Sequence, residues 1–250
     1  MIDPLHGPVV RKLGTLIDLS NEEIACLESL QTDGRTFERH ATLHGEGDRL
    51  ELTHVVRDGW AMRLKTLSDG RRQILNFILP GDFIGLYGSV SDTADHAVET
   101  LTRLHTFRFA PQRILEVFRN CPRLGAAIAW TAGQEEAILA EHVVRIGRRS
   151  AYERTAHLFL ELLKRLQLVG LAGKHSFEMP LSQDVLADAL GLSMVHVNRT
   201  LRRLRQGGLV RLVDKRLVID DVAQLERIAE FSADYIDGGA LPAATQAELR

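Results

Sequence analysis

The pattern of apolar and polar positions changes along the chain of 250 residues. Between about residues 36 and 109, short segments such as 60–64 and 104–109 alternate apolar and polar side chains. Turn-forming clusters of Gly, Pro, Asp and Ser separate these segments. Alternation with this spacing is typical of strands that have one buried face, so the region predicts a small β-barrel or sandwich.

The residues before this region show a weaker pattern. Residues 1–13 predict only a weakly specified arm. Ser20 and Glu23 then have the spacing of a capping box, and Ile24, Leu27 and Leu30 follow at helical intervals. A helix over residues 21–30 is therefore predicted.

The strongest helical signal lies between Pro180 and Gly208. Ser182 and Ser193 are placed to cap helices over 183–190 and 194–206, because a serine hydroxyl accepts a hydrogen bond from a first-turn N–H group. Gly191 tolerates the left-handed conformation that ends the first helix, which leaves a turn of three residues. A helix-turn-helix is predicted, since the small Ala187 lets the helices approach and Val197 packs inward. Four leucines complete this inner face: Leu186, Leu190, Leu192 and Leu201.

The outer face of the second helix is polar and basic. It presents His196, Asn198, Arg199, Arg202, Arg203 and Arg205, whose donors suit base edges and phosphates in a major groove. An αα-hairpin with a solvated basic face is the plainer interpretation of this segment. We predict the following DNA-binding residues: Ser182, Ser193, Met194, Val195, His196, Asn198, Arg199, Arg202, Arg203 and Lys215.

The flanking segments favour a winged helix-turn-helix over a plain hairpin of helices. Two apolar runs after Gly208 flank the polar pair Asp214-Lys215 and predict a β-hairpin. Residues 177–179 form a short extended run that can pair with it. A helix over 152–167, with one apolar face, leads into the module.

A long helix connects the two regions. After a short helical segment over 111–118, Pro122 stands where a first helical turn tolerates proline, and the pattern continues to about Arg145. A stripe on this helix can be core or a dimer seam, and we favour the seam because helix-turn-helix proteins commonly act as twofold dimers. Gly147 breaks the pattern and marks a domain boundary. The stripe contains Leu124, Ile128, Thr131, Glu135, Ile138 and His142.

Composition and charge add to this picture. With 45% hydrophobic and 26% charged residues, the chain is globular and long enough for one large domain or two ordinary ones. The formal net charge is −2, but residues 145–220 carry 14 Lys and Arg against 7 Asp and Glu, a net charge of +7. This basic segment coincides with the helix-turn-helix, as expected for a domain that binds a polyanion.

The two cysteines, Cys26 and Cys121, are too few for a disulfide framework or a four-thiolate cluster. We interpret them as small packing residues, because the sequence shows no neighbour that would lower a thiol pKa. No signal peptide or apolar run of membrane-spanning length is found, so a cytoplasmic location is expected.

The chain contains few candidate catalytic or metal-binding groups. His40 and His44 on one strand face, with Glu46 nearby, could serve a metal-binding β-barrel of cupin type, but scattered imidazoles are the favoured interpretation and no metal site is predicted. No Ser/His/Asp set, phosphate loop or carboxylate pair has a context that supports catalysis, so we do not expect an enzyme.

Together, the β-region with its segment Pro80-Gly81-Asp82-Phe83-Ile84-Gly85, the long helix and the C-terminal winged helix resemble the Crp/Fnr family of bacterial transcription regulators over about residues 20–220. The resemblance implies an α+β fold in which an N-terminal β-roll, a double-stranded β-helix like that of cyclic-nucleotide-binding domains, is joined by a long dimerisation helix to a winged helix-turn-helix domain. Residues 71–82 resemble the Fnr/FixK side of the family more than the cyclic-AMP side. The expected domains are a sensor over 1–110, connecting helices over 111–146, a DNA-binding domain over 147–236 and a disordered tail over 237–250.

The departures from the family pattern concern the effector. Cyclic-AMP-binding members have a glutamate after the last glycine and, about ten residues later, an arginine and a serine or threonine, where this chain has Leu86, His96 and Ala97. Cyclic AMP is therefore not expected to bind in the usual mode. An iron–sulfur cluster needs four cysteines, and the haem-binding histidine of the carbon-monoxide sensor is replaced by Tyr87. The effector stays unknown, with Gly85, Leu86, Tyr87, His96 and Ala97 as candidate pocket residues.

The sequence thus predicts a homodimeric regulator that binds an inverted-repeat site in double-stranded DNA and contacts RNA polymerase if it is an activator. By resemblance, Arg199 stands at the guanine-reading position, and Val195 replaces a glutamate that accepts a hydrogen bond from cytosine. The alternative is a small-molecule- or metal-binding β-barrel protein whose C-terminal winged helix mediates protein contacts.

Overall fold

The computed structural model describes residues 6–89 and 93–237, without the side chains of Tyr87 and Ser89. It divides into two compact units. Unit 1 holds the described residues up to Arg63 together with Phe77–Glu135, and unit 2 holds Leu64–Asn76 and Glu136–Ile236. The disordered tail predicted over 237–250 lies outside the described residues except for Asp237.

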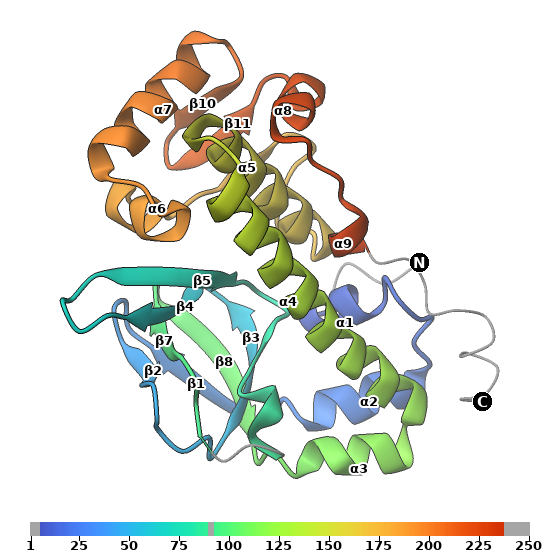
Figure 1. The fold of residues 1–250 in the computed structure, drawn as a ribbon. Coiled ribbons are helices and arrows are strands. Elements are labelled where there is room, and N and C mark those ends of the chain that lie inside the picture. The colour runs from blue at the N-terminus through green and yellow to red at the C-terminus, as the bar shows by residue number, and fades with distance from the viewer. Residues whose placement is uncertain (1–5, 90–92, 238–250) are drawn as a thin grey trace. The chain divides into compact units, whose positions relative to one another are not determined.

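The strands before α3 (Arg113–Asn120) form a β-roll, as the alternating pattern predicts (Figure 1). One four-stranded sheet has the order β1-β8-β3-β6 with antiparallel neighbours, and a second has the order β2-β7-β4-β5. The strands of the first sheet are β1 (Asp33–Phe37), β8 (Leu104–Phe109), β3 (Thr53–Asp58) and β6 (Phe83–Ile84). Those of the second are β2 (Thr42–His44), β7 (Ala97–Thr100), β4 (Ala61–Thr66) and β5 (Arg72–Ile78), and a 3₁₀ turn η1 (Leu86–Ser89) follows β6.

The core of the roll consists of the inward side chains of several strands, and Val56, Ala61, Val98 and Leu104 are less than 1% exposed. The turn between β3 and β4 requires glycine at position 59. Gly59 has φ +88°, and a Cβ atom there would lie 2.2 Å from the carbonyl oxygen of Arg103.

Three short helices pack with the start of a long one against a second apolar cluster of unit 1. They are α1 (Pro8–Leu13), α2 (Asn21–Ser29) and α3 (Arg113–Asn120), and the long helix is α4 (Pro122–Arg148). The capping box predicted for α2 is present, because Ser20 accepts a hydrogen bond from the Glu23 N–H and the Glu23 side chain accepts one from Ser20.

The weakly specified arm predicted over 1–13 is wrong for its described part. Pro8 starts α1, whose Val9, Val10 and Leu13 are buried in the apolar cluster. Lys12 forms a buried ion pair with Asp82, with 2.6 Å between Nζ and Oδ1. These contacts are long-range, so local periodicity could not reveal them.

The dimer seam predicted for the stripe on α4 is also wrong. Leu124, Ile128, Thr131, Ile138 and His142 are all buried within the single chain, so the stripe is core. A different face of α4 carries the exposed apolar side chains Leu139, Val143 and Val144. The helix also continues through Gly147 to Arg148 rather than ending near Arg145.

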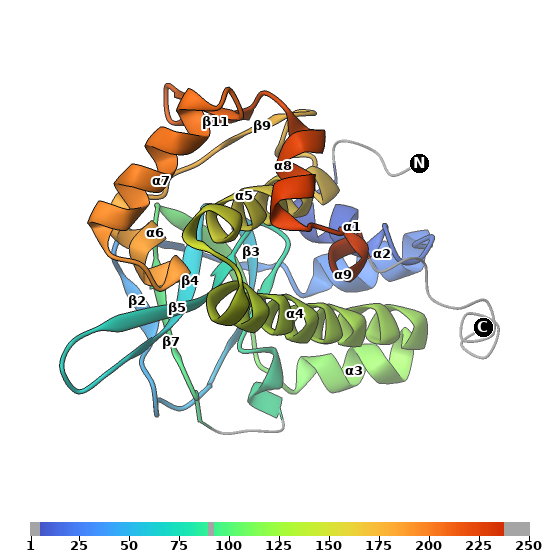
Figure 2. The same ribbon diagram turned by 45° about the horizontal axis from the view of Figure 1, so that its top comes forward.

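Unit 2 contains the predicted winged helix-turn-helix (Figures 1 and 2). Its helices are α5 (Ala151–Leu168), α6 (Gln183–Leu190), α7 (Met194–Gln206), α8 (Val222–Ala229) and α9 (Asp234–Asp237). Its three-stranded sheet, in the order β10-β11-β9, contains β9 (Ser176–Glu178), β10 (Val210–Val213) and β11 (Arg216–Ile219). None of the described helices is both long and apolar enough to cross a membrane.

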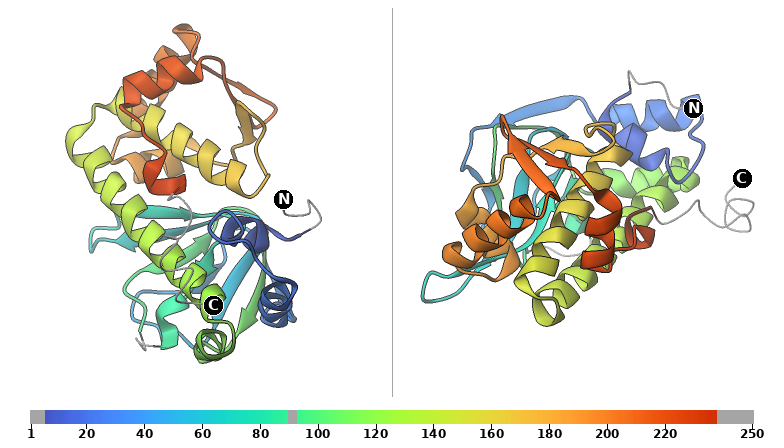
Figure 3. Two further views of the ribbon diagram at one scale, coloured as in Figure 1. Left: turned by 90° about the vertical axis from the view of Figure 1, so that its right-hand side faces the viewer. Right: turned by 90° about the horizontal axis from the view of Figure 1, so that it is seen from above.

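A polar network lies inside unit 2, where the end of α4, α5 and α9 approach one another (Figure 3). Arg145 on α4 pairs with Glu161 on α5, and their side chains are 2% and 3% exposed. The Tyr235 hydroxyl donates a hydrogen bond of 3.0 Å to Glu161. Burial and this carboxylate raise the pKa of Tyr235, which therefore remains a donor.

Candidate DNA-binding surface and effector pocket

The helix-turn-helix forms with the predicted bounds because each signal in the turn is local. Gly191 ends α6 with φ +61°, and the N–H of Leu192 donates to the Ala187 carbonyl at 3.0 Å. The Ser193 hydroxyl caps α7 by accepting a hydrogen bond from the His196 N–H at 3.3 Å. The turn and the second cap are thus confirmed.

The cap predicted for Ser182 is wrong. Ser182 occupies the N-cap position of α6, but its hydroxyl accepts no hydrogen bond from the first turn. It instead hydrogen-bonds the carboxylate of Asp184, and this bond is the main cause that holds the pKa of that carboxyl below its usual value. The charged carboxylate competes for the hydroxyl and also accepts backbone N–H bonds itself.

The two faces of α7 differ as the sequence predicts. Val197, Leu201 and Leu204 are buried, whereas the predicted DNA-binding residues of this helix are all exposed. Val195 and Met194 are large apolar residues that remain 74% and 53% exposed in the first turn. The exposed polar and basic residues are His196, Asn198, Arg199, Arg202, Arg203 and Arg205.

Among the described residues, the arginines on this face have no carboxylate partners. Within residues 6–89 and 93–237, no ion pair involves Arg199, Arg202 or Arg205. Arg203 stacks over the ring of Tyr152, with 4.4 Å between its Cζ atom and the ring centroid. The face is therefore free to meet an external polyanion.

The predicted wing is confirmed. β10 and β11 pair in antiparallel register from Val210 opposite Ile219 to Val213 opposite Arg216, and β9 pairs with β11 on its other side. Asp214 and Lys215 both have positive φ, 49° and 63°, as a two-residue hairpin turn requires. Lys215 is exposed at the tip of the wing.

The structure adds residues to this surface that the sequence prediction missed. The amino end of α5 adjoins α7 and encloses a hollow of about 420 Å³ with it. Ser150 caps α5 in a capping box with Glu153, a signal that the sequence spacing carries. The hollow is lined by Ser150, Ala151, Tyr152, Leu192, His196, Arg199, Thr200 and Arg203.

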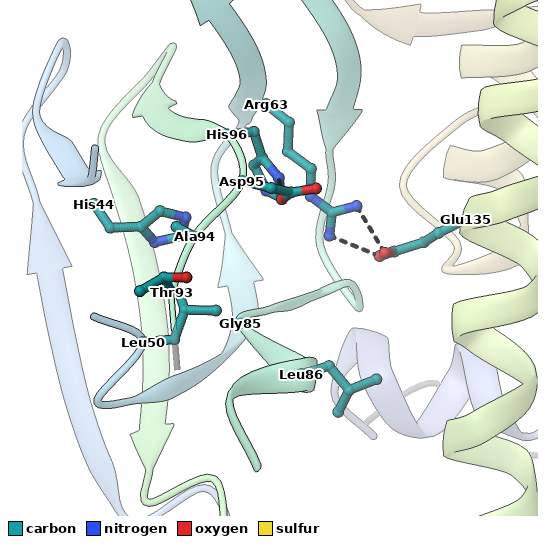
Figure 4. Close-up of a pocket in the computed structure, with 10 residues that line it drawn as sticks. All are labelled: His44, Leu50, Arg63, Gly85, Leu86, Thr93, Ala94, Asp95, His96 and Glu135. Carbon is teal, nitrogen blue, oxygen red and sulfur yellow. Dashed lines mark hydrogen bonds and ion pairs between the residues drawn. The ribbon is translucent and has the colours of Figure 1, made fainter. Parts of the chain in front are cut away.

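A second cavity, of about 300 Å³, lies inside unit 1 (Figure 4). Of the predicted effector residues, Gly85, Leu86 and His96 line it, whereas Ala97 does not. The side chain of Tyr87 lies outside the described residues. Seven lining residues were not predicted as pocket residues: His44, Leu50, Arg63, Thr93, Ala94, Asp95 and Glu135.

An ion pair crosses this pocket from the roll to α4. Arg63 on β4 binds Glu135 with two hydrogen bonds of 2.7 and 3.0 Å, and it also donates to the Phe83 carbonyl at 3.1 Å. The two side chains are only 15% and 19% exposed. A charged residue within the otherwise buried stripe of α4 was the sequence signal for Glu135.

Besides Thr93 and Asp95, the pocket is lined by two imidazoles, those of His44 and His96. Burial and the positive charges nearby lower the pKa of His44 to about 4, and its buried Nε2 has no hydrogen-bond partner among the described residues. Burial also lowers the pKa of His96, although Asp95 lies 2.5 Å from its Nδ1. The rings of His44 and His96 lie 5.8 Å apart, centroid to centroid.

The arrangement expected for a cupin-type metal site is not found. His40 precedes β2 with φ +65°, so it does not share a strand face with His44. The described residues contain no group of three or more His, Cys, Asp or Glu side chains placed to hold a metal ion.

A β-roll that encloses a small pocket and continues through a long helix into a winged helix-turn-helix defines a class of protein, the DNA-binding regulator with a sensor domain. The family model described as a cyclic nucleotide-binding domain matches residues 34–121, and that of the Crp-like helix-turn-helix domain matches residues 153–228.

Proteins that are similar to this chain in sequence or structure belong to the same class. The transcriptional activator protein FnrL of Cereibacter sphaeroides is 31% identical over 222 residues, which cover 88% of each chain. The nitrogen fixation regulation protein FixK of Bradyrhizobium diazoefficiens is 30% identical over 77% of this chain and 80% of its own. The solved structure of FixK2 from Bradyrhizobium japonicum covers 80% of this chain and 98% of its own, with a TM-score of 0.71 and 25% identity.

The chain belongs to the Crp/Fnr family, and it stands on the Fnr/FixK side of that family. It is a transcription regulator that combines a helix-turn-helix with a sensor domain of the cyclic-nucleotide-binding type. Regulators of this family bind DNA and are dimeric.

Proposed function

We propose that this protein is a homodimer that reads an inverted-repeat DNA site with α7 and answers to a small anion in the pocket of the β-roll. The observation that carries the proposal of DNA binding is the face of α7, whose Arg199, Arg202 and Arg205 are exposed and have no carboxylate partners in the part of the chain that the structure describes. The alternative of a winged helix for protein contacts would call for an apolar or acidic outer face, and this face is basic. We propose a sensor domain over residues 1–110, connecting helices over 111–146 and a DNA-binding domain over 147–236, and we propose a cytoplasmic location because the chromosome is there.

The contacts divide into base-reading and phosphate-binding ones. Arg199 lies one turn into α7, where its guanidinium fork fits the O6 and N7 acceptors of guanine. Val195 is 74% exposed and accepts no hydrogen bond, so we expect a thymine methyl rather than a cytosine opposite it. His196 and Asn198 supply further polar contacts. The phosphate contacts are assigned to Ser182, Ser193, Arg202, Arg203 and Lys215, and Met194 is assigned an apolar contact near the groove edge.

The second copy of the chain is proposed to pack on the exposed face of α4. Leu139 and Val143 stand one turn apart there and Val144 adjoins them, so a twofold partner would bury all three. A twofold dimer places two recognition helices on inverted half-sites about one helical turn apart. Because the relatives FnrL and FixK are an activator and a regulation protein, we propose that the DNA-bound dimer contacts RNA polymerase and has no catalytic activity.

Selection of DNA sequences by the purified protein tests this proposal, followed by affinity measurements across a range of salt concentrations. We expect an inverted repeat, and we expect log affinity to fall linearly with log salt with a slope of roughly 0.9 per neutralised phosphate. An affinity that is the same at low and moderate salt would show that the basic face does not bind duplex DNA.

The pocket points to an anion as the effector. Arg63 is the one cationic side chain among the residues that line it, and Glu135 on α4 already neutralises that charge. A carboxylate or phosphate group of a ligand can replace Glu135 on Arg63, and neutral His44 and His96 can donate hydrogen bonds to it. Replacement of Glu135 by the ligand would break this ion pair between the roll and α4. The ligand could thereby favour one state of the regulator.

Thermal shift measurements with inorganic phosphate, small dicarboxylates and cyclic nucleotides test this assignment. Glu135→Gln removes the carboxylate that competes with the anion for Arg63, so we expect this variant to bind the anion about tenfold or more tightly, or about 1.4 kcal/mol. Arg63→Met should abolish the shift, and Glu136→Gln, on the next exposed position of α4, is the matched control. Equal shifts in all four proteins would contradict the role of the ion pair. Cyclic AMP should not raise stability, since Leu86, His96 and Ala97 stand where its usual ligands would be.

A further inference from the structure

The two cysteines of the chain lie far apart in sequence but meet in unit 1. Cys26 on α2 lies beside Cys121, the residue that ends α3 and precedes α4. Both are free and half-buried, and both pack against the same apolar cluster. The sequence showed no neighbour for either thiol because each one is the neighbour of the other.

Independent contacts on both sides of the pair hold the same helices together. One turn before Cys26, Glu23 forms an ion pair with Arg123 in the first turn of α4 at 3.8 Å. One turn after it, Ser29 accepts hydrogen bonds of 3.1 and 3.3 Å from Arg113 on α3, at its carbonyl and its hydroxyl. Cys26 and Cys121 therefore lie between two fixed bridges, and α2, α3 and the first turns of α4 lie together in Figures 1 and 2.

The backbone around Cys121 is well anchored. Its N–H donates to the Val117 carbonyl at 2.8 Å, and its own carbonyl accepts from the Gly125 N–H at 2.9 Å. Gly125 packs so close to α3 that a Cβ atom would lie 2.7 Å from the ring of Phe118. A crosslink here would join α2 to a rigid junction, directly before the first residue of α4.

We propose that Cys26 and Cys121 are a redox modification site, which a peroxide converts to an intramolecular disulfide and a reductant restores. The half-burial of both sulfur atoms favours a small oxidant over a bulky one. In the reduced protein, burial and the neighbouring Cys121 thiol raise the pKa of Cys26 to about 11, so Cys26 stays protonated at neutral pH. The charge of Arg113 lowers this pKa and that of Glu23 raises it.

The chemistry balances with hydrogen peroxide as the oxidant. The Cys121 thiolate attacks one peroxide oxygen, so that an S–O bond forms, the O–O bond breaks and hydroxide leaves to take up the released proton as water. The Cys26 sulfur then attacks the Cys121 sulfur, so that the S–S bond forms, the S–O bond breaks and the hydroxyl leaves with the Cys26 proton as a second water. Two thiols and one peroxide become one disulfide and two waters.

The test uses the full chain, reduced, freed of reductant and titrated with hydrogen peroxide. We expect both thiols to disappear together at one equivalent, a linked peptide that contains Cys26 and Cys121, monomers on a non-reducing gel, and complete reversal by dithiothreitol. The oxidised protein should also unfold at a higher denaturant concentration, because the disulfide closes a long loop in the unfolded chain.

Cys26→Ser and Cys121→Ser are the matched variants, and each should lose both the linked peptide and the gain in stability. Independent loss of the two thiols, crosslinks between chains, or thiols that react only after denaturation would overturn the proposal. These readouts are chemical, so they stand whether or not the protein binds the expected DNA. If a serine variant fails to fold, peptide mapping of the wild type alone still decides the matter.

Discussion

Two sets of arginines in unit 2 occur in two environments, one exposed and the other buried and paired. On α7, Arg199, Arg202 and Arg205 are exposed and have no carboxylate partner in the part of the chain that the structure describes. Between α4, α5 and α9, Arg145 is 2% exposed and faces Glu161, which the Tyr235 hydroxyl also contacts. The same residue type is thus available to an external partner on α7 and forms an internal ion pair at Arg145.

The difference shows how to interpret a basic segment. The net charge of +7 over residues 145–220 counts paired and unpaired arginines alike, yet only the unpaired ones raise the potential outside the molecule. A buried charge must be paired, because its desolvation costs several kcal/mol. Four changes test this contrast, from the largest expected effect to the smallest.

Loss of the interior carboxylate should have the largest effect. Glu161→Gln leaves the Arg145 guanidinium buried without a counter-charge, and we expect it to lower the free energy of unfolding by about 3–5 kcal/mol in urea. The matched control is Asp220→Asn, which breaks the pair between Arg211 and Asp220 on the surface, where Arg211 is 61% exposed. That variant should lose less than about 1 kcal/mol. Equal losses in the two variants would contradict the contrast between buried and exposed pairs.

The second largest effect should be a decrease in the free energy of unfolding at acid pH. His157 is 1% exposed, its Nε2 lies 3.3 Å from Glu141, and its Nδ1 has no hydrogen-bond partner among the described residues. Burial, with Arg145 and Arg149 nearby, lowers its pKa to about 2. His157 therefore binds a proton near pH 6.5 in the unfolded chain, whereas it stays neutral at that pH in the folded chain.

The sign follows from this difference in bound protons. Stability from His157 is fully present above pH 6.5 and is lost as the pH falls toward the folded pKa, by about 1.4 kcal/mol per pH unit and about 3 kcal/mol at pH 4. His157→Phe keeps a ring against Tyr235 and Phe231 but cannot titrate, so its denaturation midpoint should depend less on pH. An unchanged pH dependence would show that His157 is already charged in the folded state.

On the recognition face, the effect should appear in binding rather than in folding. Arg199→Ala should cost about 1–3 kcal/mol per half-site and relax the preference at one guanine, with an unfolding free energy within about 0.5 kcal/mol of the wild type. Arg203→Ala should weaken all sequences alike if Arg203 binds only phosphate. Selection of DNA sequences by each variant checks this, and an Arg199→Ala protein with the wild-type preference would refute the assignment.

The two serines at N-cap positions, Ser182 and Ser193, give the smallest and most closely matched comparison. Ser193→Ala removes the hydrogen bond to the His196 N–H and should lower the free energy of unfolding by about 1 kcal/mol. Ser182 has the same position on α6, but Ser182→Ala removes no cap bond, so the decrease in the free energy of unfolding should be much smaller. Similar losses in thermal denaturation would show that Ser182 caps α6 after all.

The success of the sequence predictions follows the range of the interactions behind them. The bounds of α6 and α7, the left-handed Gly191 and the wing with its turn at Asp214 and Lys215 depend on residues a few positions apart, and the structure has them as predicted. Ser182 failed because a second local acceptor, Asp184, competed for its hydroxyl. The order of these parts also indicated the family that the comparisons then showed.

Several other errors and omissions involve partners that are distant in sequence. The periodicity of α4 identified a buried stripe but could not tell whether a second copy or the chain itself covers it. Lys12 with Asp82, Arg63 with Glu135, and Cys26 with Cys121 are each pairs between separate elements. The periodicity of one helix or strand does not indicate which residue of another element its side chains contact.

By itself the sequence determined α6, α7 and the wing, the outward basic face of α7 and the class of protein, because helix caps, turns and alternation are set by neighbouring residues. Only the tertiary structure decided which arginines are paired, which polar groups line the pocket with Gly85 and Leu86, and which two thiols meet. The physical reason is that charge pairing, burial and thiol contact depend on distance in space, and the fold of the β-roll and the packing of α4 set those distances.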